Sequence, residues 1–427
     1  MGEAAGRLFV GVDVGTSGVR ACALDAWGRI HGEAERALEP PVAAGSRSEQ
    51  DPESWWAGLA AAVAELAAAV GGERVAALAV DSTSGTLVVT DAAGRPLRPA
   101  LLYNDRRAAD EAGEIARLAP VESGAHGAAS SLAKLRHLHL RGELAGARHA
   151  LHAAEWLGGR LTGSYGAGDE NNCLKLGYDP VSRSWPGWVG ELVPPGLLPE
   201  VVAPGSAVGT LAGGAAAELG LPAGAAVRAG TTDSVAAFLA TGAGDRGEAV
   251  TSLGSSLALK VVGERPVFAP EYGVYSHRLG ERWLPGGASN SGGAVLLQHF
   301  SRAELAALTP QLEPDSPTGL DYLPLPAPGE RFPDNDPDLQ PRIEPIPADR
   351  RRFLQGLLEG IAAVEARGYR RLAELGAPYP VSVRTAGGGA ANPAWTRIRG
   401  RLLGVPMADA DSGEAACGAA RLAMGTV

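Results

Sequence analysis

The sequence predicts an α/β protein built from two domains related by duplication. The chain has 427 residues, 45% of them hydrophobic, which suggests two hydrophobic cores rather than one. Short apolar segments with strand spacing alternate with longer segments of helical spacing. Residues 250–262 have the same order of strand, glycine, two hydroxyl residues and strand as residues 8–24. We therefore expect each half of the chain to begin with the same β-hairpin.

The first predicted element is this hairpin. Residues 8–14 and 19–24 have the composition of strands, and a glycine-rich turn joins them. A second turn, "DAWGR" at residues 25–29, places Gly28 in a left-handed conformation and leads to a third strand. Because the glycine turn joins antiparallel strands and opens no helix, it is neither a P-loop nor a Rossmann fingerprint.

A helix and two more strands follow. Asp51 is a good N-cap, Pro52 suits the first helical position, and Gly71 closes the helix. Strands are predicted at residues 75–80 and 87–90, and the segment "DSTSGT" lies between them. Helical segments dominate from about residue 106 to residue 160. The apolar residues that recur at helical spacing in the first helix are Trp55, Leu59, Val63, Leu66 and Val70.

The second hairpin matches the first residue by residue. When Gly254 is placed on Gly15, Ser255 falls on Thr16, Ser256 falls on Ser17, and Ser252 falls on Asp13. The glycine-rich residues 235–249 are expected to link the two domains. Residues 305–350 hold much of the proline and are expected to form an irregular excursion.

The charge pattern excludes some classes of partner. The formal net charge is −10, and the arginines are scattered among acidic residues. Neither a nucleic-acid surface nor an anionic-membrane surface is expected. No uncharged apolar segment approaches the ~18 residues of a membrane span. The only lysines are Lys134, Lys175 and Lys260.

The cysteines and the N-terminus indicate a cytoplasmic protein. Cys22, Cys173 and Cys417 have no paired spacing, which suits a reducing compartment and argues against a structural zinc site. The histidines show no ligand spacing either. The first residues lack the basic and apolar stretches of a signal peptide and do not match a myristoylation pattern.

The two glycine turns have the composition of a phosphate clamp. Glycine lets the main chain approach an anion, and threonine or serine adds hydroxyl donors. Asp13 is unusual, because a carboxylate in a buried strand is costly unless it has a partner. It either caps the amides of its own turn or organises the water shell of Mg²⁺, which prefers carboxylate and phosphate oxygens.

Two further stretches combine a strand end with polar residues. Asp233, in "AGTTDSVAAF", lies where a strand gives way to a helix that begins near Ser234. By itself it is an ordinary helix N-cap. In "TAGGGAANPAW", residues 385–395, three glycines precede a helix that starts near Pro393. Such a loop permits close approach of a flat ligand or of a phosphate to the helix N-terminus.

Together these stretches resemble the FGGY carbohydrate kinases, of the actin-like ATPase superfamily. The resemblance covers nearly the whole chain, and the motifs occur in the family's order. Three stretches already described resemble the first phosphate motif, the catalytic-aspartate segment and the adenosine loop. The other matching stretches are "SEQDPESWW" (48–56), "YNDRRA" (103–108), "SSLAKLRHL" (130–138) and "TSLGSS" (251–256).

The resemblance implies two ribonuclease H-like domains with an interdomain cleft. Residues 1–240 would form the N-terminal kinase domain, with the sugar site, the first phosphate loop and the catalytic aspartate. Residues 241–427 would form the C-terminal kinase domain, with the second phosphate loop and the adenosine loop. The implied reaction is the transfer of the γ-phosphate of ATP to a sugar, with Mg²⁺ as the metal.

The resemblance also assigns roles to residues. Asp233 is implied as the general base that accepts the proton of the sugar hydroxyl. Asp13 would position Mg²⁺ through water. The implied nucleotide-binding residues are Asp13, Gly15, Thr16, Ser17, Gly254, Ser255, Ser256, Gly388, Gly389 and Asn392.

The substrate is expected to be a pentulose. The family's sugar contacts match Thr83, Ser84, Gly85 and Tyr103 here, beside Asp233. Typical xylulose kinases carry Gln-Met-His in this loop, whereas this chain has Thr-Ser-Gly. Its "DSTSGT" form looks more like the compact D-ribulose kinases, so phosphorylation of D-ribulose to D-ribulose 5-phosphate is the leading expectation. Ser84 is equally well interpreted as a plain turn residue.

Two alternatives stay open. The substrate can be D-xylulose or another ketose or polyol of the family, since one hydrogen bond to one hydroxyl can decide stereochemistry. The chain can also be an actin-like ATPase that acts on no sugar. The segments "SEQDPESWW" and "YNDRRA" argue against the second alternative, because they resemble sugar kinases rather than actins.

Overall fold

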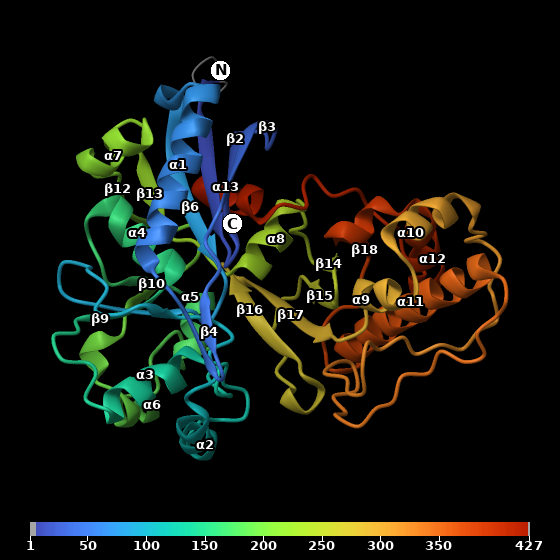
Figure 1. Ribbon diagram of the computed structural model, residues 1–427. Coiled ribbons are helices and arrows are strands. Elements are labelled where there is room, and N and C mark those ends of the chain that lie inside the picture. The colour runs from blue at the N-terminus through green and yellow to red at the C-terminus, as the bar shows by residue number, and fades with distance from the viewer. Residues whose placement is uncertain (1–5, 426–427) are drawn as a thin grey trace. The chain divides into compact units, whose positions relative to one another are not determined.

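The computed structural model describes residues 6–425 and confirms the α/β class (Figure 1). The described residues separate into two compact units. The first unit contains residues 6–240 and 414–425, and the second contains Thr241–Gly413. The chain therefore returns to the first unit before Glu414, whereas the sequence assigned everything after residue 240 to the second domain.

A six-stranded sheet forms the centre of the first unit, in the order β12-β13-β6-β1-β2-β3. β1 pairs antiparallel with β2 and parallel with β6. The side chains of β1 are buried almost throughout, as expected for a strand covered on both faces. The strands are β1 (Leu8–Val14), β2 (Gly18–Asp25), β3 (Ile30–Ala37), β6 (Val75–Ser82), β12 (Ala207–Thr210) and β13 (Ala226–Arg228).

Helices cover both faces of this sheet. Even-numbered residues of β1, such as Val10 and Val12, share one hydrophobic cluster with α1 (Pro52–Val70), α4 (Ala153–Thr162) and α7 (Gly213–Leu219). Asp51 caps α1 as predicted, Pro52 is its first residue, and Gly71 closes it. The other face is covered by α13 (Ala415–Ala423), which packs against α8 (Asp233–Ala240). Figure 1 shows α13, in red, beside the blue strands of this sheet.

Two glycines explain why α13 belongs to the first unit. A Cβ atom on Gly11 of β1 would lie 2.0 Å from the carbonyl oxygen of Ala416. A Cβ atom on Gly418 would lie 1.8 Å from the carbonyl oxygen of Ala236 in α8. Only glycine permits such close backbone approach. The helix is thereby fitted to both β1 and α8.

A second sheet in the first unit has the order β4-β5-β8-β7-β9. The loop of residues 83–86 connects it to the six-stranded sheet. Its own hydrophobic cluster is built largely from short helices, and two small strands pair separately. The elements are β4 (Val42–Ala44), β5 (Arg47–Gln50), β7 (Leu87–Thr90), β8 (Ala100–Leu101), β9 (His149–His152), α2 (Ala109–Leu118), α3 (Ser131–Leu140), α5 (Glu170–Cys173), α6 (Gly187–Leu192), β10 (Ala167–Asp169) and β11 (Glu200–Val202).

The second unit has a five-stranded sheet in the order β16-β17-β15-β14-β18. The long helix α11 packs on this sheet and on α12. Residues 312–349 contain none of the named helices or strands, so the irregular excursion is shorter than the predicted 305–350, because residues 305–308 belong to α10 and Thr309–Gln311 form a 3₁₀ helix. The elements are β14 (Glu248–Leu253), β15 (Leu257–Val261), β16 (Tyr275–Leu279), β17 (Arg282–Ser289), β18 (Ser382–Ala386), α9 (Gly293–His299), α10 (Arg302–Leu308), α11 (Arg350–Glu374) and α12 (Pro393–Leu403).

The link between the units is shorter than predicted. The sequence assigned residues 235–249 to it, but α8 continues to Ala240 and β14 begins at Glu248. The apolar residues Val235, Phe238 and Leu239 are buried within α8. Their burial extends the helix into a stretch whose glycines had suggested a linker.

The two predicted hairpins have the same frame. In each, a three-residue turn joins two antiparallel strands: residues 15–17 between β1 and β2, and residues 254–256 between β14 and β15. Each first strand also pairs in parallel on its other side, β1 with β6 and β14 with β18. Asp13 and Ser252 occupy the same penultimate position of the first strand, as the sequence alignment predicted.

Cys22 of β2 and Cys417 of α13 form a disulfide, with Cα atoms 5.3 Å apart. Their separation in the sequence suggested no pairing, because the pair depends on how α13 packs over β2.

Among the described helices, none is both long and apolar enough to cross a membrane.

Candidate active site

The first predicted phosphate turn is held from outside by a glutamine. Gly15 donates its backbone N–H to the carbonyl of Gly18 at 3.0 Å, which closes the turn. The side-chain amide of Gln50 donates to the carbonyl oxygen of Thr16 at 3.1 Å. Gln50 in turn accepts a hydrogen bond from the indole of Trp55 at 2.8 Å. The glutamine and tryptophan of the "SEQDPESWW" segment therefore support the turn.

Asp13 lies one residue before the end of β1, on the face covered by α13. It is 9% exposed, and burial raises the pKa of its carboxyl group above the ordinary value. The nearest cation is the guanidinium of Arg20, with 3.8 Å between Nη1 and Oδ2. Arg20 is shared, since it also pairs with Glu35 at 3.0 Å and with Glu414 at 3.8 Å.

Asp81 is a second carboxylate beside Asp13 and was not among the site residues predicted from the sequence. The parallel pairing of β1 and β6 aligns the two residues directly. Asp81 is fully buried, and neither of its oxygens has a hydrogen-bond partner among the described residues. Burial is the main cause that raises the pKa of Asp81 well above its usual range, and the neighbouring Asp13 carboxylate raises it further.

A sequence signal for Asp81 did exist. The segment "DSTSGT" follows a buried strand, and its first residue is a carboxylate near the strand's end, as Asp13 is in β1. Adjacent parallel strands bring their carboxyl ends to the same sheet edge. The missing information was the register, because a shift of one residue would turn Asp81 to the opposite face.

Asp233 is the first residue of α8. The carbonyl oxygen of Thr232 accepts from the N–H groups of Val235 and Ala236, while the Asp233 carboxylate accepts from the next residue, Ser234, at 2.6 Å. Thr232 also forms a parallel bridge with Ser82, the last residue of β6. Asp233 therefore follows a segment adjacent to the end of β6, and its charge contributes to the raised pKa of Asp81.

A small hollow adjoins the first turn. It is about 10 Å³ in volume, roughly enough for one water molecule. Of the predicted substrate residues, Thr83 lines it together with Gly15 and Thr16. The side chain of Tyr103 is 45% exposed, and this residue does not line the hollow. The lining residues are Val14, Gly15, Thr16, Gln50, Trp55, Thr83, Thr86, Leu102 and Ala153.

A buried lysine joins the two predicted sugar-binding loops. Lys134 of α3 donates to the carbonyl oxygen of Gly85 at 2.8 Å and to that of Leu102, next to Tyr103, at 2.6 Å. The side chain is fully buried, and this burial lowers the pKa of Lys134 to about 7. The segment "SSLAKLRHL" thus supplies a group that fixes the relative positions of both loops.

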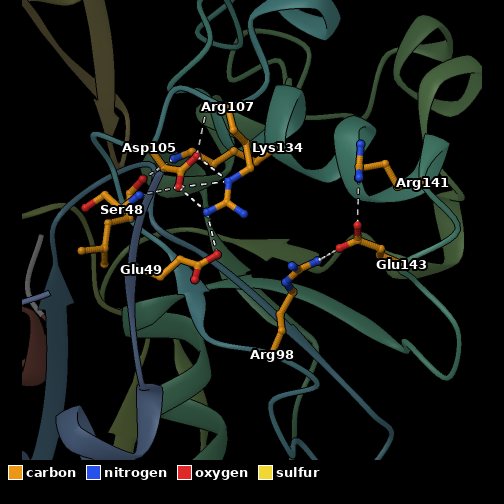
Figure 2. Close-up of polar contacts among 9 residues, drawn as sticks. Ser48, Glu49, Arg98, Asp105, Arg107, Lys134, Arg141 and Glu143 are labelled. Carbon is orange, nitrogen blue, oxygen red and sulfur yellow. Dashed lines mark hydrogen bonds and ion pairs between the residues drawn. The ribbon is translucent and has the colours of Figure 1, made fainter. Parts of the chain in front are cut away.

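Asp105 connects the same region to β5, as Figure 2 shows. Its carboxylate accepts from the backbone N–H of Ser48 at 2.7 Å and from the guanidinium of Arg107. Arg107 also donates to Glu49 at 2.6 Å, and these contacts lower the pKa of Asp105 despite its burial. The segments "SEQD" and "YNDRR" are therefore held together by one charged network.

The second predicted phosphate turn lies at the start of α9. Gly254 donates its N–H to the carbonyl of Ser256 at 3.1 Å, as expected for a tight turn. The carbonyl oxygens of Gly254 and Ser255 accept from Gly293 and Ala294 at 2.8 and 3.1 Å. Gly254 and Ser255 are exposed.

The glycine-rich loop lies against the same turn within the second unit. A Cβ atom on Gly389 would lie 2.3 Å from the side chain of Leu253, the residue before Gly254. Gly388 and Gly389 belong to a short 3₁₀ helix at Gly388–Ala391. The side chain of Asn392 caps α12 by accepting from the N–H of Trp395 at 2.9 Å. The helix start near Pro393 is as predicted, and Asn392 is already engaged as its cap.

The predicted residues thus form two groups, each inside its own unit. The first group combines the turn of residues 15–17 with Asp13, Asp233 and the loop of residues 83–85, and the structure adds Asp81. The second group combines the turn of residues 254–256 with the glycine-rich loop and Asn392. Hydroxyl-rich turns, carboxylates at strand ends and a glycine loop are groups that bind phosphates, cations and nucleotides.

Comparison with protein families identifies the class. The N-terminal domain of the FGGY family of carbohydrate kinases matches residues 8–240, and the C-terminal domain matches residues 249–426. The chain belongs to the FGGY family of carbohydrate kinases, as the motifs indicated.

Individual relatives agree with this assignment. A Streptomyces coelicolor protein named "Xylulose kinase" is 33% identical over 304 residues, which cover 67% of this chain and 60% of that protein. The match therefore spans about 60% of the length of this relative. An Escherichia coli K12 protein of the same name is 26% identical over 436 residues, with 97% of this chain and 89% of that protein covered.

Solved structures share the two-domain fold. A structure named as a "xyloylose kinase" from Brucella ovis has a TM-score of 0.87 and 26% identity, covering 98% of this chain and 90% of its own. A xylulose kinase structure from Rhodospirillum rubrum has a TM-score of 0.84 at 24% identity, covering 98% and 89%. The second similarity concerns the fold alone.

Proposed function

We propose that this protein is an ATP-dependent kinase that phosphorylates a terminal hydroxyl of a pentulose. The observation that carries the proposal is the set of carboxylates in the first unit. Asp13 and Asp81 lie at the ends of adjacent parallel strands, and Asp233 follows the segment beside them. The hydroxyl-rich turn of residues 15–17 comes directly after Asp13. Phosphoryl transfer uses carboxylates to hold a metal ion and to accept a proton, and it uses hydroxyl and backbone groups of a turn to hold phosphates.

Asp233 serves as the general base in this proposal. As the terminal oxygen of the sugar bonds to the γ-phosphorus, the bond from that phosphorus to the β-phosphate oxygen breaks and ADP leaves. The hydroxyl proton passes to the Asp233 carboxylate. The start of α8 holds Asp233 beside the end of β6, so the base has a rigid support.

The donor set fits a divalent cation. Both oxygens of Asp81 are buried without a hydrogen-bond partner among the described residues, and Asp13 lies beside it. Carboxylate oxygens are preferred ligands of Mg²⁺, so Asp13, together with Asp81, would hold the ion. When bound, Mg²⁺ neutralises charge on the phosphates.

The remaining predicted residues bind the nucleotide and the sugar in this proposal. Thr16, Ser17, Ser255 and Ser256 donate hydroxyl groups to phosphates of the nucleotide. Gly388, Gly389 and Asn392 line the adenosine pocket. Thr83, Ser84, Gly85 and Tyr103 contact the sugar, and Lys134 supports this site because it holds the carbonyls of Gly85 and Leu102.

Two pentuloses are candidates. The Thr-Ser-Gly sequence at residues 83–85 supports D-ribulose, since typical xylulose kinases carry Gln-Met-His there. The names of the Streptomyces and Escherichia relatives support D-xylulose. Small side chains at residues 83 and 84 leave more room and one hydroxyl each for hydrogen bonding, which favours D-ribulose as the first substrate to test.

A coupled assay of ADP release tests the proposal. The purified full chain is supplied with ATP and Mg²⁺ and with D-ribulose, D-xylulose, L-ribulose or glycerol in turn. We expect at least one pentulose to stimulate ADP release strongly. Release of ADP that no sugar stimulates would instead support an actin-like ATPase.

Variants of Asp233 test the base. Asp233→Asn should lower kcat by about 10²–10⁴-fold, the range for loss of a general base, with little change in KM. Ser234→Ala, at the neighbouring position on α8, is the matched control and should keep most of the activity. Full activity of the Asn variant would leave Asp233 with only a structural role.

A further inference from the structure

The disulfide between Cys22 and Cys417 lies beside the carboxylate of Glu33, which takes no part in the disulfide bond. β2 and β3 pair so that Cys22 is directly opposite Glu33. The Sγ atom of Cys417, on α13, lies 3.9 Å from Oε1 of Glu33. The two sulfur atoms and one carboxylate oxygen all lie within 4.8 Å of one another. The strands β2 and β3 and the helix α13 therefore bring three potential ligand atoms close together.

This arrangement matches the ligand chemistry of a thiophilic divalent cation. Thiolate sulfur and carboxylate oxygen are both common ligands of Zn²⁺. Two thiolates and a carboxylate would repel one another without a cation between them. Within the described part of the chain, no arginine, lysine or histidine forms an ion pair with Glu33, because the nearby Arg20 pairs with Glu35, Glu414 and Asp13.

An open hollow gives solvent access to the cluster. It is about 430 Å³ in volume and is bounded by β2, β3 and the start of α13. Three carboxylates and one guanidinium line it, so its potential favours cations. Both cysteines are 1% exposed, whereas Glu33 reaches the hollow. The lining residues are Arg20, Ala21, Glu33, Ala34, Glu35, Glu414 and Ala416.

We propose that the reduced Cys22–Cys417 pair and Glu33 form a binding site for a Zn²⁺-class cation, with water from the hollow completing its coordination. This proposal does not rest on the proposed kinase function. In its reduced form the metal links β2, β3 and α13, and in its oxidised form the disulfide links β2 and α13.

The reduced, metal-binding form and the disulfide form exclude each other. The electrons and protons of their interconversion balance. A dithiol reductant supplies two electrons and two protons to the disulfide, which becomes two thiols while the reductant becomes a cyclic disulfide. Binding of the cation then displaces both thiol protons. Oxidation of the pair removes both sulfur ligands and releases the metal. Metal uptake must therefore depend on prior reduction.

Titration with Cd²⁺ and Zn²⁺ tests the site in the full chain. The protein is reduced with dithiothreitol, freed of reductant without air, and titrated with Cd²⁺ while the sulfur-to-cadmium ultraviolet band is recorded. Zn²⁺ affinity is measured against a chromophoric chelator. We expect one equivalent of metal per chain after reduction and none before it.

Matched variants assign the ligands. Cys22→Ser and Cys417→Ser should abolish the band, and Cys173→Ser should not, because Cys173 is buried elsewhere in the first unit. Glu33→Gln should weaken Zn²⁺ binding by at least ~10-fold. Glu35→Gln is its control, since Glu35 lies two residues along the same strand and pairs with Arg20.

Three results would overturn the proposal. Absence of metal uptake by the reduced protein would leave the pair a disulfide only. Equal binding by Glu33→Gln and Glu35→Gln would remove the carboxylate from the site. Binding that survives in Cys22→Ser would locate the metal elsewhere. Glu33 is a surface residue, so its variant tests the site even if a cysteine variant unfolds.

Discussion

The two hairpins share a backbone frame and differ in charge. In the first unit, Asp13 pairs in parallel register with Asp81. In the second unit, the residue at the same place is Ser252, and its partner is Ala386. The turn, the antiparallel strand and the parallel neighbour occur in both units, whereas the carboxylate pair occurs in the first unit only. The frame thus supplies two hydroxyl-rich turns, and only the first has the carboxylate pair that the proposed cation site uses.

The hairpins also differ in what supports them. The turn of the first hairpin is held from outside by neutral hydrogen bonds, from the Gln50 amide to Thr16 and from the backbone N–H of Leu38 to Ser17. In the second hairpin, Thr251 of β14 donates to Glu365 at 2.5 Å, and Glu365 forms a buried ion pair with Arg399 at 2.7 Å. Both ionic side chains are 1% exposed, so the second hairpin depends on a charged network inside its core.

The largest expected effect on stability concerns that network. Glu365→Ala leaves the Arg399 guanidinium buried without its partner, which should destabilise the second unit by about 3–5 kcal/mol. Gln50→Ala, the counterpart in the first hairpin, should cost about 1–2 kcal/mol. Chemical denaturation followed by circular dichroism measures both. A cost for Gln50→Ala as large as that for Glu365→Ala would remove this contrast between the hairpins.

The next effect is a loss of kcat that follows from the charge difference between Asp13 and Ser252, which occupy matched positions in the two hairpins. Asp13→Ser converts the first hairpin to the composition of the second and should lower kcat by about 100-fold, or about 2.7 kcal/mol. Ser252→Ala removes one neutral hydroxyl and should cost less than ~10-fold. Steady-state kinetics with the best pentulose compares them. Equal losses would mean that the two hairpins contribute alike.

A smaller effect is expected at Asp81. Asp81→Asn removes a buried ionisable carboxyl group, whose raised pKa opposes folding at neutral pH, with little change in the shape of the side chain. In the absence of divalent ions it should stabilise the first unit by about 1–3 kcal/mol. It should also weaken Mn²⁺ binding, measured by electron paramagnetic resonance, by at least ~10-fold, whereas the exposed Asp110→Asn should change neither property. Unchanged Mn²⁺ binding in Asp81→Asn would exclude Asp81 as a ligand.

The last effect is a pH dependence from Lys134, which is small for each single pH unit. Burial lowers the pKa of Lys134 to about 7 in the folded protein, from the ordinary lysine value of 10.5, so between these values the unfolded chain binds more protons. Stability should therefore rise with pH, by at most about 1.4 kcal/mol per unit. The charges of Asp105, Arg107 and Lys175 act on this group.

The comparison with Lys134→Met isolates this contribution. Methionine has a similar length and does not titrate, so its stability curve should lack the rise that the wild type shows above about pH 7. Thermal unfolding across pH 7 to 10 measures the difference between the two curves. Parallel curves would mean that Lys134 keeps its proton when the protein folds.

Local features of the fold followed from the sequence. The hairpins, the bounds of α1 and the left-handed Gly28 depend on short-range rules of strands, caps and turns, and the structure has them as predicted. The segments "YNDRR" and "SSLAKL" were recognised as a resemblance only. Their roles in holding Ser48, Gly85 and Leu102 could not be read from the sequence, because they depend on contacts between distant segments.

The family, the two glycine turns and the position of Asp13 within its strand could be predicted from the sequence alone, because these depend on motifs and on neighbouring residues. The position of Asp81 opposite Asp13, the return of α13 to the first unit and the contact between Cys22 and Cys417 became known only from the fold. Each of these depends on strand register or on close backbone packing between segments far apart in the chain. A one-residue shift would change such contacts and leave every local pattern intact.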